Sequence, residues 1–484
     1  MNYKMMGRFI AQILLLEAVC MIPAMGISLV CGEQKAVFGF GVSILLIMAV
    51  FVLLRYFCRG HKKGFYARDG LVCVGVGWIV LSFMGCLPFY ISGAIPHFLD
   101  AMFEIVSGFT TTGASILPEV ESLPKGMLYW RSFSHWLGGM GVLVFLLAIV
   151  PAGEKQSGFT MHILRAESPG PSVGKLVPRM RRTAAILYLL YIVLTILNIF
   201  FLLIGDMPLF DALCTAFGTA GTGGFGIKND SMASYSPYLQ NVCTVFMLLF
   251  GVNFSCYYLL VMRRVRNVLH DEELRLYFGI IIASIALIVW NLGSYYDTLE
   301  ETVRHGAFQV ASIITTTGFA TTDFDKWPAF SKAIILCLMV AGACAGSTGG
   351  GIKCSRVLLL FKSSYRNIRK VLDPQKIQTV RINGNKVDES VVENTNIYLV
   401  TYVFIVIASF LVISLDGFST TTNFSAVLAC FNNIGPGLDA VGPVCNFSQY
   451  SILSKSVLIL DMLAGRLEIF PILILFSRSA WRHR

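Results

Sequence analysis

Long apolar segments alternate with short polar connections along the whole of this sequence. Ten of the segments approach the ~20 residues that an α-helix needs to cross a bilayer. They lie at about 8–30, 37–57, 70–92, 130–152, 184–205, 238–262, 276–296, 330–361, 396–415 and 453–477. The pattern predicts an all-α polytopic membrane protein with about ten transmembrane helices. Because that number is even, both termini are expected on one side of the membrane.

Four shorter segments lie between the long ones and are too short to cross the membrane. They are Phe98 to Phe109, Leu209 to Thr219, Thr302 to Ile314 and Asn423 to Phe431. Each leads into a loop of small residues with glycine, namely Thr110–Gly113, Gly221–Gly224, Thr315–Gly318 and Asn432–Gly435. Irregular backbone at membrane depth is tolerated only where it is buried in protein or lines a cavity. The short segments are therefore predicted to be re-entrant.

The order span, short helix, glycine loop and span occurs four times, which is a strong signal of an internal repeat. We expect four pseudo-repeats of helix, pore helix, filter loop and helix around one central pore. An N-terminal helix pair takes up 1–69, and the pore repeats take up 70–155, 156–265, 266–390 and 391–484. No connection is long enough for a separate extramembrane domain.

Composition excludes an ordinary soluble domain. Of 484 residues, 55% are hydrophobic and 14% charged, with a mean hydropathy of +0.69, whereas soluble domains carry about 25% charged residues. The net charge of +10 comes from basic residues on every second connection, at 55–68, 165–182, 263–266, 353–381 and 478–484. The positive-inside rule places such connections in the cytoplasm. The basic excess therefore indicates topology, with both termini cytoplasmic, and not nucleic-acid binding.

The glycine loops have the composition of an ion-selective pore. A cation in a narrow pore exchanges its water for other oxygens, and backbone carbonyls supply them. Glycine adopts the positive φ values that turn successive carbonyls toward one axis. The C-terminal ends of the short helices carry partial negative charge, which favours a cation between them. One such loop is typical of a simple turn, but four in equivalent places indicate a pore.

Over essentially its whole length, the chain resembles the Trk/Ktr/HKT superfamily of potassium transporters, and most closely its Trk-type membrane subunits. The matching motifs are Phe109–Ser115, Trp136–Gly141, Thr222–Phe225, Thr315–Phe319, Ala345–Lys353 and Asn432–Gly437. The resemblance implies a pseudo-fourfold pore from one chain, with Gly113, Gly223, Gly318 and Gly435 as the filter glycines. In related transporters, serine at the first of these positions accompanies Na⁺ permeation, so Gly113 favours K⁺.

The resemblance thus implies K⁺ as the transported ion, held only by the filter. The second loop departs from related chains in having Gly218 and Gly221 where serine is common. The implied potassium-binding residues are Thr111, Thr112, Gly113, Thr222, Gly223, Thr316, Thr317, Gly318, Asn433, Ile434 and Gly435.

The eighth span is interrupted by the glycine-rich stretch Ala341 to Gly351. Each glycine costs a helix roughly 1 kcal/mol relative to alanine, so the stretch predicts a broken helix; the alternative is close helix packing through small residues. The resemblance implies an intramembrane gating loop. The implied gate residues are Gly346, Gly349, Gly350, Gly351, Lys353 and Arg466. The alternative interpretation of Lys353 is that its side chain extends to the cytoplasmic interface.

Three charges, Asp461, Arg466 and Glu468, lie inside the tenth span. Intramembrane charges are expensive and mark a function or a partner. The resemblance implies that Arg466 faces the pore beneath the filter and opposes the cation. The alternative is a structural pair with Glu468 or Asp461, which their spacing along one helix does not favour.

Besides membrane lipid, the resemblance implies two partners: a second copy of the chain, and a cytoplasmic regulatory subunit of the TrkA type that carries the nucleotide. The resemblance also implies a location in the bacterial inner membrane.

The alternative function is a Na⁺- or H⁺-coupled secondary transporter, which predicts two inverted hairpins instead of four. An enzyme lacks support, since the histidines are dispersed without a metal-binding motif, and most of them are interpreted as interfacial or solvated. They include His97, His135, His162, His270 and His305.

Overall fold

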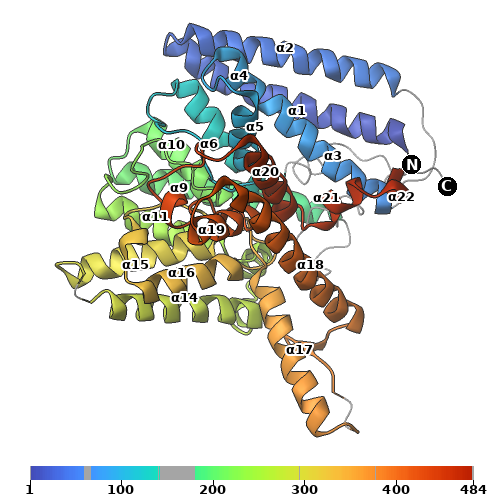
Figure 1. The fold of residues 1–484 in the computed structure, drawn as a ribbon, viewed down its shortest axis with the longest axis vertical. Coiled ribbons are helices and arrows are strands. Elements are labelled where there is room, and N and C mark those ends of the chain that lie inside the picture. Colours follow the sequence, from blue (N-terminus) through green and yellow to red (C-terminus); the bar gives the residue numbers. More distant parts are fainter. Residues whose placement is uncertain are drawn as a thin grey trace.

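The computed structural model describes residues 2–58, 67–139, 141, 180–293, 295–375 and 378–481. It begins with an antiparallel helix pair, α1 (Tyr3–Val30) and α2 (Gln34–Phe57), which lies along one side of the molecule (Figure 1). Both helices are apolar all round, and α2 buries few of its side chains. An apolar helix that does not bury its surface in protein needs lipid around it.

Four units of the same element order follow the helix pair, as the sequence predicted. Each has an outer helix, a short helix, a glycine loop and a second helix. The outer helices are α3 (Ala67–Gly85) with α4 (Leu87–Ser92), α9 (Met180–Ile204), α14 (Glu272–Asn291) and α18 (Glu389–Ile413). The short helices are α5 (Phe98–Phe109), α10 (Leu209–Gly221), α15 (Leu299–Ile314) and α19 (Thr420–Phe431). The second helices begin with α6 (Lys125–Gly139), α11 (Pro237–Phe250), α16 (Ala329–Ala341) and α20 (Ile452–Arg466).

Six helices of the described part are long and apolar enough to cross a membrane without interruption, and they correspond to the first, second, third, fifth, seventh and ninth predicted spans. The other predicted spans are the second helices of the units. The sixth is a bent pair, with 88° between α11 and α12 (Phe254–Val261). The eighth is broken between α16 and α17 (Cys354–Leu372), and the fourth extends beyond the described residues. The all-α multi-pass architecture is thus confirmed.

The sequence predicted uninterrupted helices at 238–262 and 453–477, and both predictions are wrong. The first helix breaks where Asn253 starts α12 by accepting a hydrogen bond from the Ser255 backbone. The second breaks after Arg466, because Glu468 and Ile469 take φ of 61° and 66° before α21 (Phe470–Leu475). The proline at position 471 suits the first turn of the new helix, where no backbone donor is needed.

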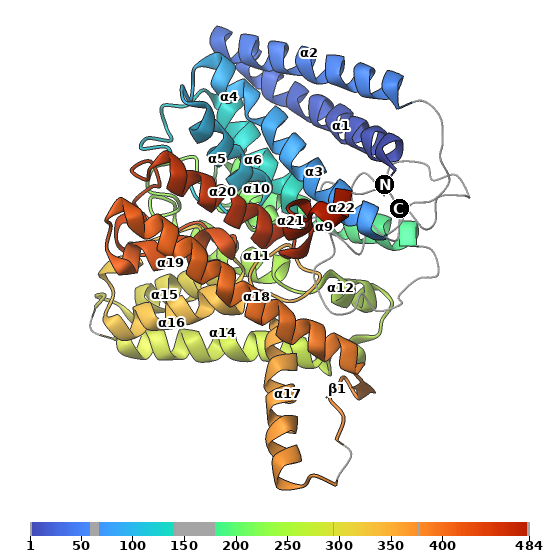
Figure 2. The same ribbon diagram turned by 45° about the vertical axis from the view of Figure 1, so that its right-hand side comes forward.

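Helix α17 projects from the body (Figures 1 and 2). It continues eleven residues beyond the predicted end of the eighth span at 361. A two-stranded hairpin, β1 (Arg381–Ile382) and β2 (Asn385–Lys386), connects α17 to α18. Its turn residues Asn383 and Gly384 both have positive φ, as a tight hairpin turn requires. The predicted repeat boundary at 390 falls inside the first turn of α18.

The two described ends of the chain meet at the same end of the helix bundle. The short C-terminal helix α22 (Arg478–Trp481) lies beside the start of α1, where the Tyr3 hydroxyl donates to the Trp481 carbonyl at 3.2 Å. Such a meeting fits an even number of membrane crossings. In Figure 1, both ends lie on the side away from the loop between α1 and α2.

Asp439, in the connection after the fourth glycine loop, fastens that connection to the start of α19. Its carboxylate accepts hydrogen bonds from Ser419 at 2.5 Å and Thr422 at 2.7 Å, and these bonds lower its pKa. Because the pKa of Asp439 in the folded protein is lower than the usual pKa of an aspartate, these bonds stabilise the fold fully above that usual pKa. The stabilisation is lost as the pH falls through the lowered pKa.

We therefore expect Asp439→Asn, which keeps a residue that tolerates the observed φ of 58°, to lower the melting temperature slightly at neutral pH. The variant is also expected to flatten the decline of melting temperature below about pH 4. Thermal unfolding in detergent at graded pH measures both. Equal pH dependence in the two proteins contradicts the assignment.

Candidate functional site

The four glycine loops, called loop 1 to loop 4 in chain order, share one backbone conformation. Within two residues of the end of each short helix comes a residue with left-handed φ. These residues are Thr111, Thr222, Thr316 and Asn433, with φ of 55°, 53°, 57° and 56°. Left-handed φ is a genuine outlier for a β-branched residue. Its occurrence in three equivalent threonines shows that the surrounding structure enforces a strained conformation, as is typical of functional sites.

Two residues later, each loop has a glycine with positive φ, and we call these four the ring glycines. They are Gly113, Gly224, Gly318 and Gly435, with φ of 79°, 73°, 87° and 97°. The sequence predicted Gly223 as the counterpart of Gly113, whereas in the structure Gly224 takes that place. Gly223 instead occupies the position of Thr112, since both backbone amides donate to the carbonyl five residues earlier, at 2.9 and 2.8 Å.

The ring glycines bring the four loops into a closed ring. A Cβ built on each would overlap the carbonyl oxygen of the next loop, so only glycine permits this approach. Gly113 meets the carbonyl of Gly223, Gly224 that of Thr317, Gly318 that of Ile434, and Gly435 that of Thr112. The loops therefore contact one another in chain order, and the fourth returns to the first. The C-terminal ends of four helices converge on this ring.

Side chains brace the ring from behind. The hydroxyls of Thr110 and Thr112 lie 2.8 Å apart, and those of Thr315 and Thr317 repeat the arrangement in loop 3 at the same distance. Loop 4 is connected to loop 1 by Asn433, whose Nδ2 donates to the Thr112 hydroxyl at 2.9 Å. The predicted potassium-binding residues other than glycine are all fully buried in the ring.

His135 of α6 also holds the ring, a role that was not predicted from the sequence. Its Nδ1 lies 2.8 Å from the Gly108 carbonyl, and its Nε2 accepts from the Phe225 backbone at 3.3 Å, so Nδ1 carries the proton. His135 and His305 are exceptions to the interpretation of most histidines as interfacial or solvated, since both are buried. His162 lies outside the described residues.

The interrupted segment, Gly342–Lys353 between α16 and α17, lies directly against the ring. The Gly350 amide donates to the hydroxyl of Thr316 at 2.5 Å. A Cβ on Gly349 would lie 2.8 Å from the carbonyl oxygen of Thr315, so the backbones pack without side chains between them. The predicted break in the eighth span is confirmed, and it positions irregular backbone under loop 3.

Lys353, the last residue of the interrupted segment, has an unusual burial and backbone conformation for a lysine. It is 3% exposed, has a φ of 76°, and donates from Nζ to the carbonyl of Gly349. The alternative that it extends to the cytoplasmic interface is therefore wrong. Gly346 and Gly351 also take positive φ. Gly346 is exposed, and its carbonyl accepts from the Phe254 backbone at 3.0 Å.

Arg466, the last residue of α20, connects three elements below loop 1. One guanidinium nitrogen donates to the Thr111 hydroxyl at 3.2 Å and to the Thr348 carbonyl at 2.9 Å. The other donates to the carbonyls of Gly138 and Gly139 at 2.5 and 2.7 Å. The side chain thus joins loop 1, the interrupted segment and the end of α6, where helix carbonyls lack partners within the helix.

The two acidic residues of the tenth span have other partners. Glu468, in the break after α20, binds Arg356 of α17 through both carboxylate oxygens. Asp461 accepts from the Ser409 hydroxyl at 2.8 Å. The ion pair between Glu468 and Arg356 therefore connects the break after α20 to α17, the helix that follows the interrupted segment. Movement of one of them displaces the other.

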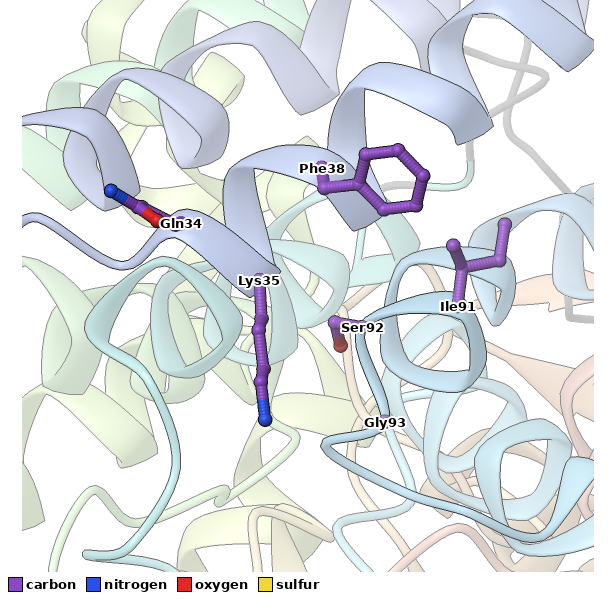
Figure 3. Close-up of a pocket in the computed structure, with 6 residues that line it drawn as sticks. All are labelled: Gln34, Lys35, Phe38, Ile91, Ser92 and Gly93. Atoms are coloured by element: carbon purple, nitrogen blue, oxygen red, sulfur yellow. The ribbon is translucent and has the colours of Figure 1, made fainter.

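An open pocket of 420 Å³ lies elsewhere, between the start of α2 and the end of α4 (Figure 3). It is lined by Gln34, Lys35, Phe38, Ile91, Ser92 and Gly93. None of the predicted site residues lines it. Within the described ranges, no group of three or more histidine, cysteine or acidic side chains is arranged to hold a metal ion. The ring and the elements below it therefore form the candidate site.

Comparisons with known proteins agree with this architecture. The sequence profile of the TrkH family, described as a cation transport protein, matches residues 38–482. The chain is 34% identical to the Trk system potassium uptake protein TrkH of Salmonella typhimurium, with both chains fully covered. It is 33% identical to the Trk system potassium uptake protein TrkG of Escherichia coli over 96% of each chain. The crystal structure of the potassium transporter TrkH from Vibrio parahaemolyticus matches with a TM-score of 0.88, 31% identity and full coverage of both chains.

Proposed function

Since the chain belongs to the TrkH family of cation transport proteins, we propose that it is the membrane subunit of a potassium uptake system and conducts K⁺ through the ring of loops 1 to 4. The observation that carries this proposal is the closed ring itself, in which each ring glycine meets the carbonyl of the next loop. A ring of this kind gathers carbonyl oxygens from four equivalent segments around one axis, as replacement of a hydration shell requires.

In this proposal, the carbonyls of Thr112, Gly223, Thr317 and Ile434 belong to the oxygens that replace water around K⁺. The four short helices place their C-terminal partial negative charge at the same centre and stabilise the cation at membrane depth. The buried threonine hydroxyls and His135 hold the loops in their strained conformation, so that the oxygens are arranged before the ion enters.

The interrupted segment serves as the gate. Its backbone occupies the space under loops 3 and 4, and Arg466 fastens it to loop 1 at its Thr348 carbonyl. In this conformation, a positive charge and packed backbone lie on the path of an ion that leaves the ring. Opening therefore requires the segment and the Arg466 side chain to withdraw together.

A cytoplasmic regulatory subunit that binds a nucleotide drives that withdrawal in our proposal, and the transporter works as a homodimer in the bacterial inner membrane with both termini cytoplasmic. The basic connections near the described ends support this orientation through the positive-inside rule. The projecting helix α17 continues from the gate, so a partner that moves α17 moves the segment.

Ion flux into liposomes that contain the purified chain tests the proposal. We expect K⁺ flux to exceed Na⁺ flux, and Gly318→Ser to reduce that preference by roughly tenfold, because a side chain at this position forces the loops apart. Gly279→Ser is the matched control, since no atom lies within 4 Å of a Cβ there. Equal movement of both ions in the parent chain contradicts the filter and favours a coupled hairpin transporter. If neither ion moves, Arg466→Ala opens the gate for the same comparison.

A further inference from the structure

Behind loops 1 and 2 lies an ion pair that the conduction mechanism does not use. Glu104 of α5 and Arg131 of α6 meet at 2.5 Å between Oε1 and Nε, and their side chains are 0% and 3% exposed. In each of the other ion pairs between described residues, at least one side chain is about one-fifth exposed or more. A charge buried so completely is costly unless all its hydrogen bonds are satisfied.

Each partner of the pair holds a different loop. The Glu104 carboxylate accepts from the Ser115 hydroxyl at 3.0 Å and from the Ile116 amide at 3.0 Å, just beyond loop 1. Arg131 donates to the Gly226 carbonyl at 2.8 Å, and its guanidinium lies 3.6 Å from the centre of the Phe225 ring, just beyond loop 2.

Ser115 and Gly226 occupy equivalent places, because each lies two residues after its ring glycine. The ion pair therefore joins the outer rims of two neighbouring loops through a rigid fork. Arginine suits this task because its planar guanidinium presents donors in fixed directions, so that a bond to the carboxylate and a bond to the carbonyl fix each other's geometry.

Only the first repeat carries a charge at this place. The residues nine positions before the four ring glycines are Glu104, Thr215, Gln309 and Ala426. Neutral hydrogen bonds hold the outer rims of the other two loops. In loop 3, the Ser312 hydroxyl donates to the Phe319 carbonyl at 2.6 Å, and in loop 4 the Gly437 amide donates to the Val441 carbonyl at 2.7 Å. The ring is thus braced asymmetrically.

We propose that Glu104 and Arg131 are positioning residues for ion selectivity, which keep the rims of loops 1 and 2 at the separation that suits K⁺. The inference rests on the proposed conduction through the ring. A ring of carbonyls discriminates between K⁺ and Na⁺ only while its oxygens resist collapse around the smaller ion. Release of two adjacent loops lets their oxygens approach Na⁺, and the preference for K⁺ declines without any change in the ring residues themselves.

The reversal potential under opposed K⁺ and Na⁺ gradients, measured on the purified full chain in bilayers, tests this role. Arg131→Lys keeps a charge opposite Glu104 but cannot bind the carboxylate and the Gly226 carbonyl in the same geometry. We expect its K⁺ to Na⁺ permeability ratio to fall by roughly tenfold. The matched control is the double variant Asp100→Asn with Lys455→Met, which removes the other ion pair of α5, at 2.7 Å, and is expected to keep the parent ratio.

A second variant separates positioning from mere stability. Glu104→Leu combined with Arg131→Met replaces both charges by apolar side chains, which preserves folding better than the loss of one partner alone. We expect this variant to reach the membrane, melt near the parent temperature and remain poorly selective, since neither loop is braced. A permeability ratio equal to that of the parent in this variant or in Arg131→Lys overturns the proposal. If the parent itself does not discriminate between the ions, the proposed conduction fails instead.

Discussion

Replacement of Gly224 by alanine will abolish K⁺ uptake. Its φ of 73° costs an alanine about 1–2 kcal/mol, and the added Cβ would overlap the carbonyl of Thr317 in the neighbouring loop. Because backbone must move to relieve that overlap, the ring widens where the ion passes. A displacement of about 1 Å at a reacting centre costs on the order of a hundredfold, and we expect a loss of uptake at least that large.

Gly223→Ala provides the sharpest comparison, since the two glycines are adjacent. A Cβ at Gly223 would overlap the ring of His135, which is a side chain, and not a backbone carbonyl. Shortening that side chain by His135→Ala therefore relieves the overlap of Gly223→Ala, and we expect partial recovery of K⁺ uptake in the double variant. The same change leaves Gly224→Ala inactive.

Uptake is measured by complementation of a strain that lacks its own K⁺ uptake systems, with the amount of membrane protein checked by immunoblot. Gly41→Ala is the control, because no atom lies within 4 Å of a Cβ there. Full uptake by Gly224→Ala, or recovery of Gly224→Ala by His135→Ala, contradicts the assignment of Gly224 to the ring.

The short helices were predicted well from the sequence because a distinct type of residue follows each of them. The predicted bounds Phe98 to Phe109 are those of α5, and the other three short helices were predicted within a few residues. Each is an apolar run too short to span the membrane that stops at a group of small residues. The glycine-rich break in the eighth span was also predictable, since consecutive glycines disfavour a helix regardless of what surrounds it.

Other features depend on contacts that a single sequence does not contain. In loop 2, two consecutive glycines, Gly223 and Gly224, follow Thr222, so composition alone does not decide which of them joins the ring. Ile469 takes a φ of 66° with no glycine adjacent to it, and only its surroundings impose such a conformation. Arg131 was a missed signal, because a charge inside a predicted span indicates a function or a partner.

Removal of the Arg466 guanidinium is expected to raise K⁺ flux through the purified chain in the absence of any cytoplasmic subunit. Arg466→Ala frees the Thr348 carbonyl from loop 1 and removes a positive charge below the ring. At an effective dielectric constant of about 20, two unit charges 4 Å apart repel by about 4 kcal/mol. A barrier lowered by even part of that amount raises flux on the order of a hundredfold.

Two further variants divide the effect between charge and hydrogen bonding. Arg466→Lys keeps the charge but binds fewer of the carbonyls, so it is expected to raise flux less than alanine does. Arg304→Gln removes a positive charge from α15, on the opposite side of the ring from the gate, and is expected to leave flux unchanged.

Flux is measured in liposomes under an imposed K⁺ gradient, with thermal unfolding as the check on folding. A folded Arg466→Ala protein with the flux of the parent contradicts the placement of the gate at this side chain. If flux rises equally in the lysine and alanine variants, the hydrogen bonds of the Arg466 guanidinium alone account for the closed state. The fastening of the interrupted segment to loop 1, and not repulsion of the ion, then holds the pore shut.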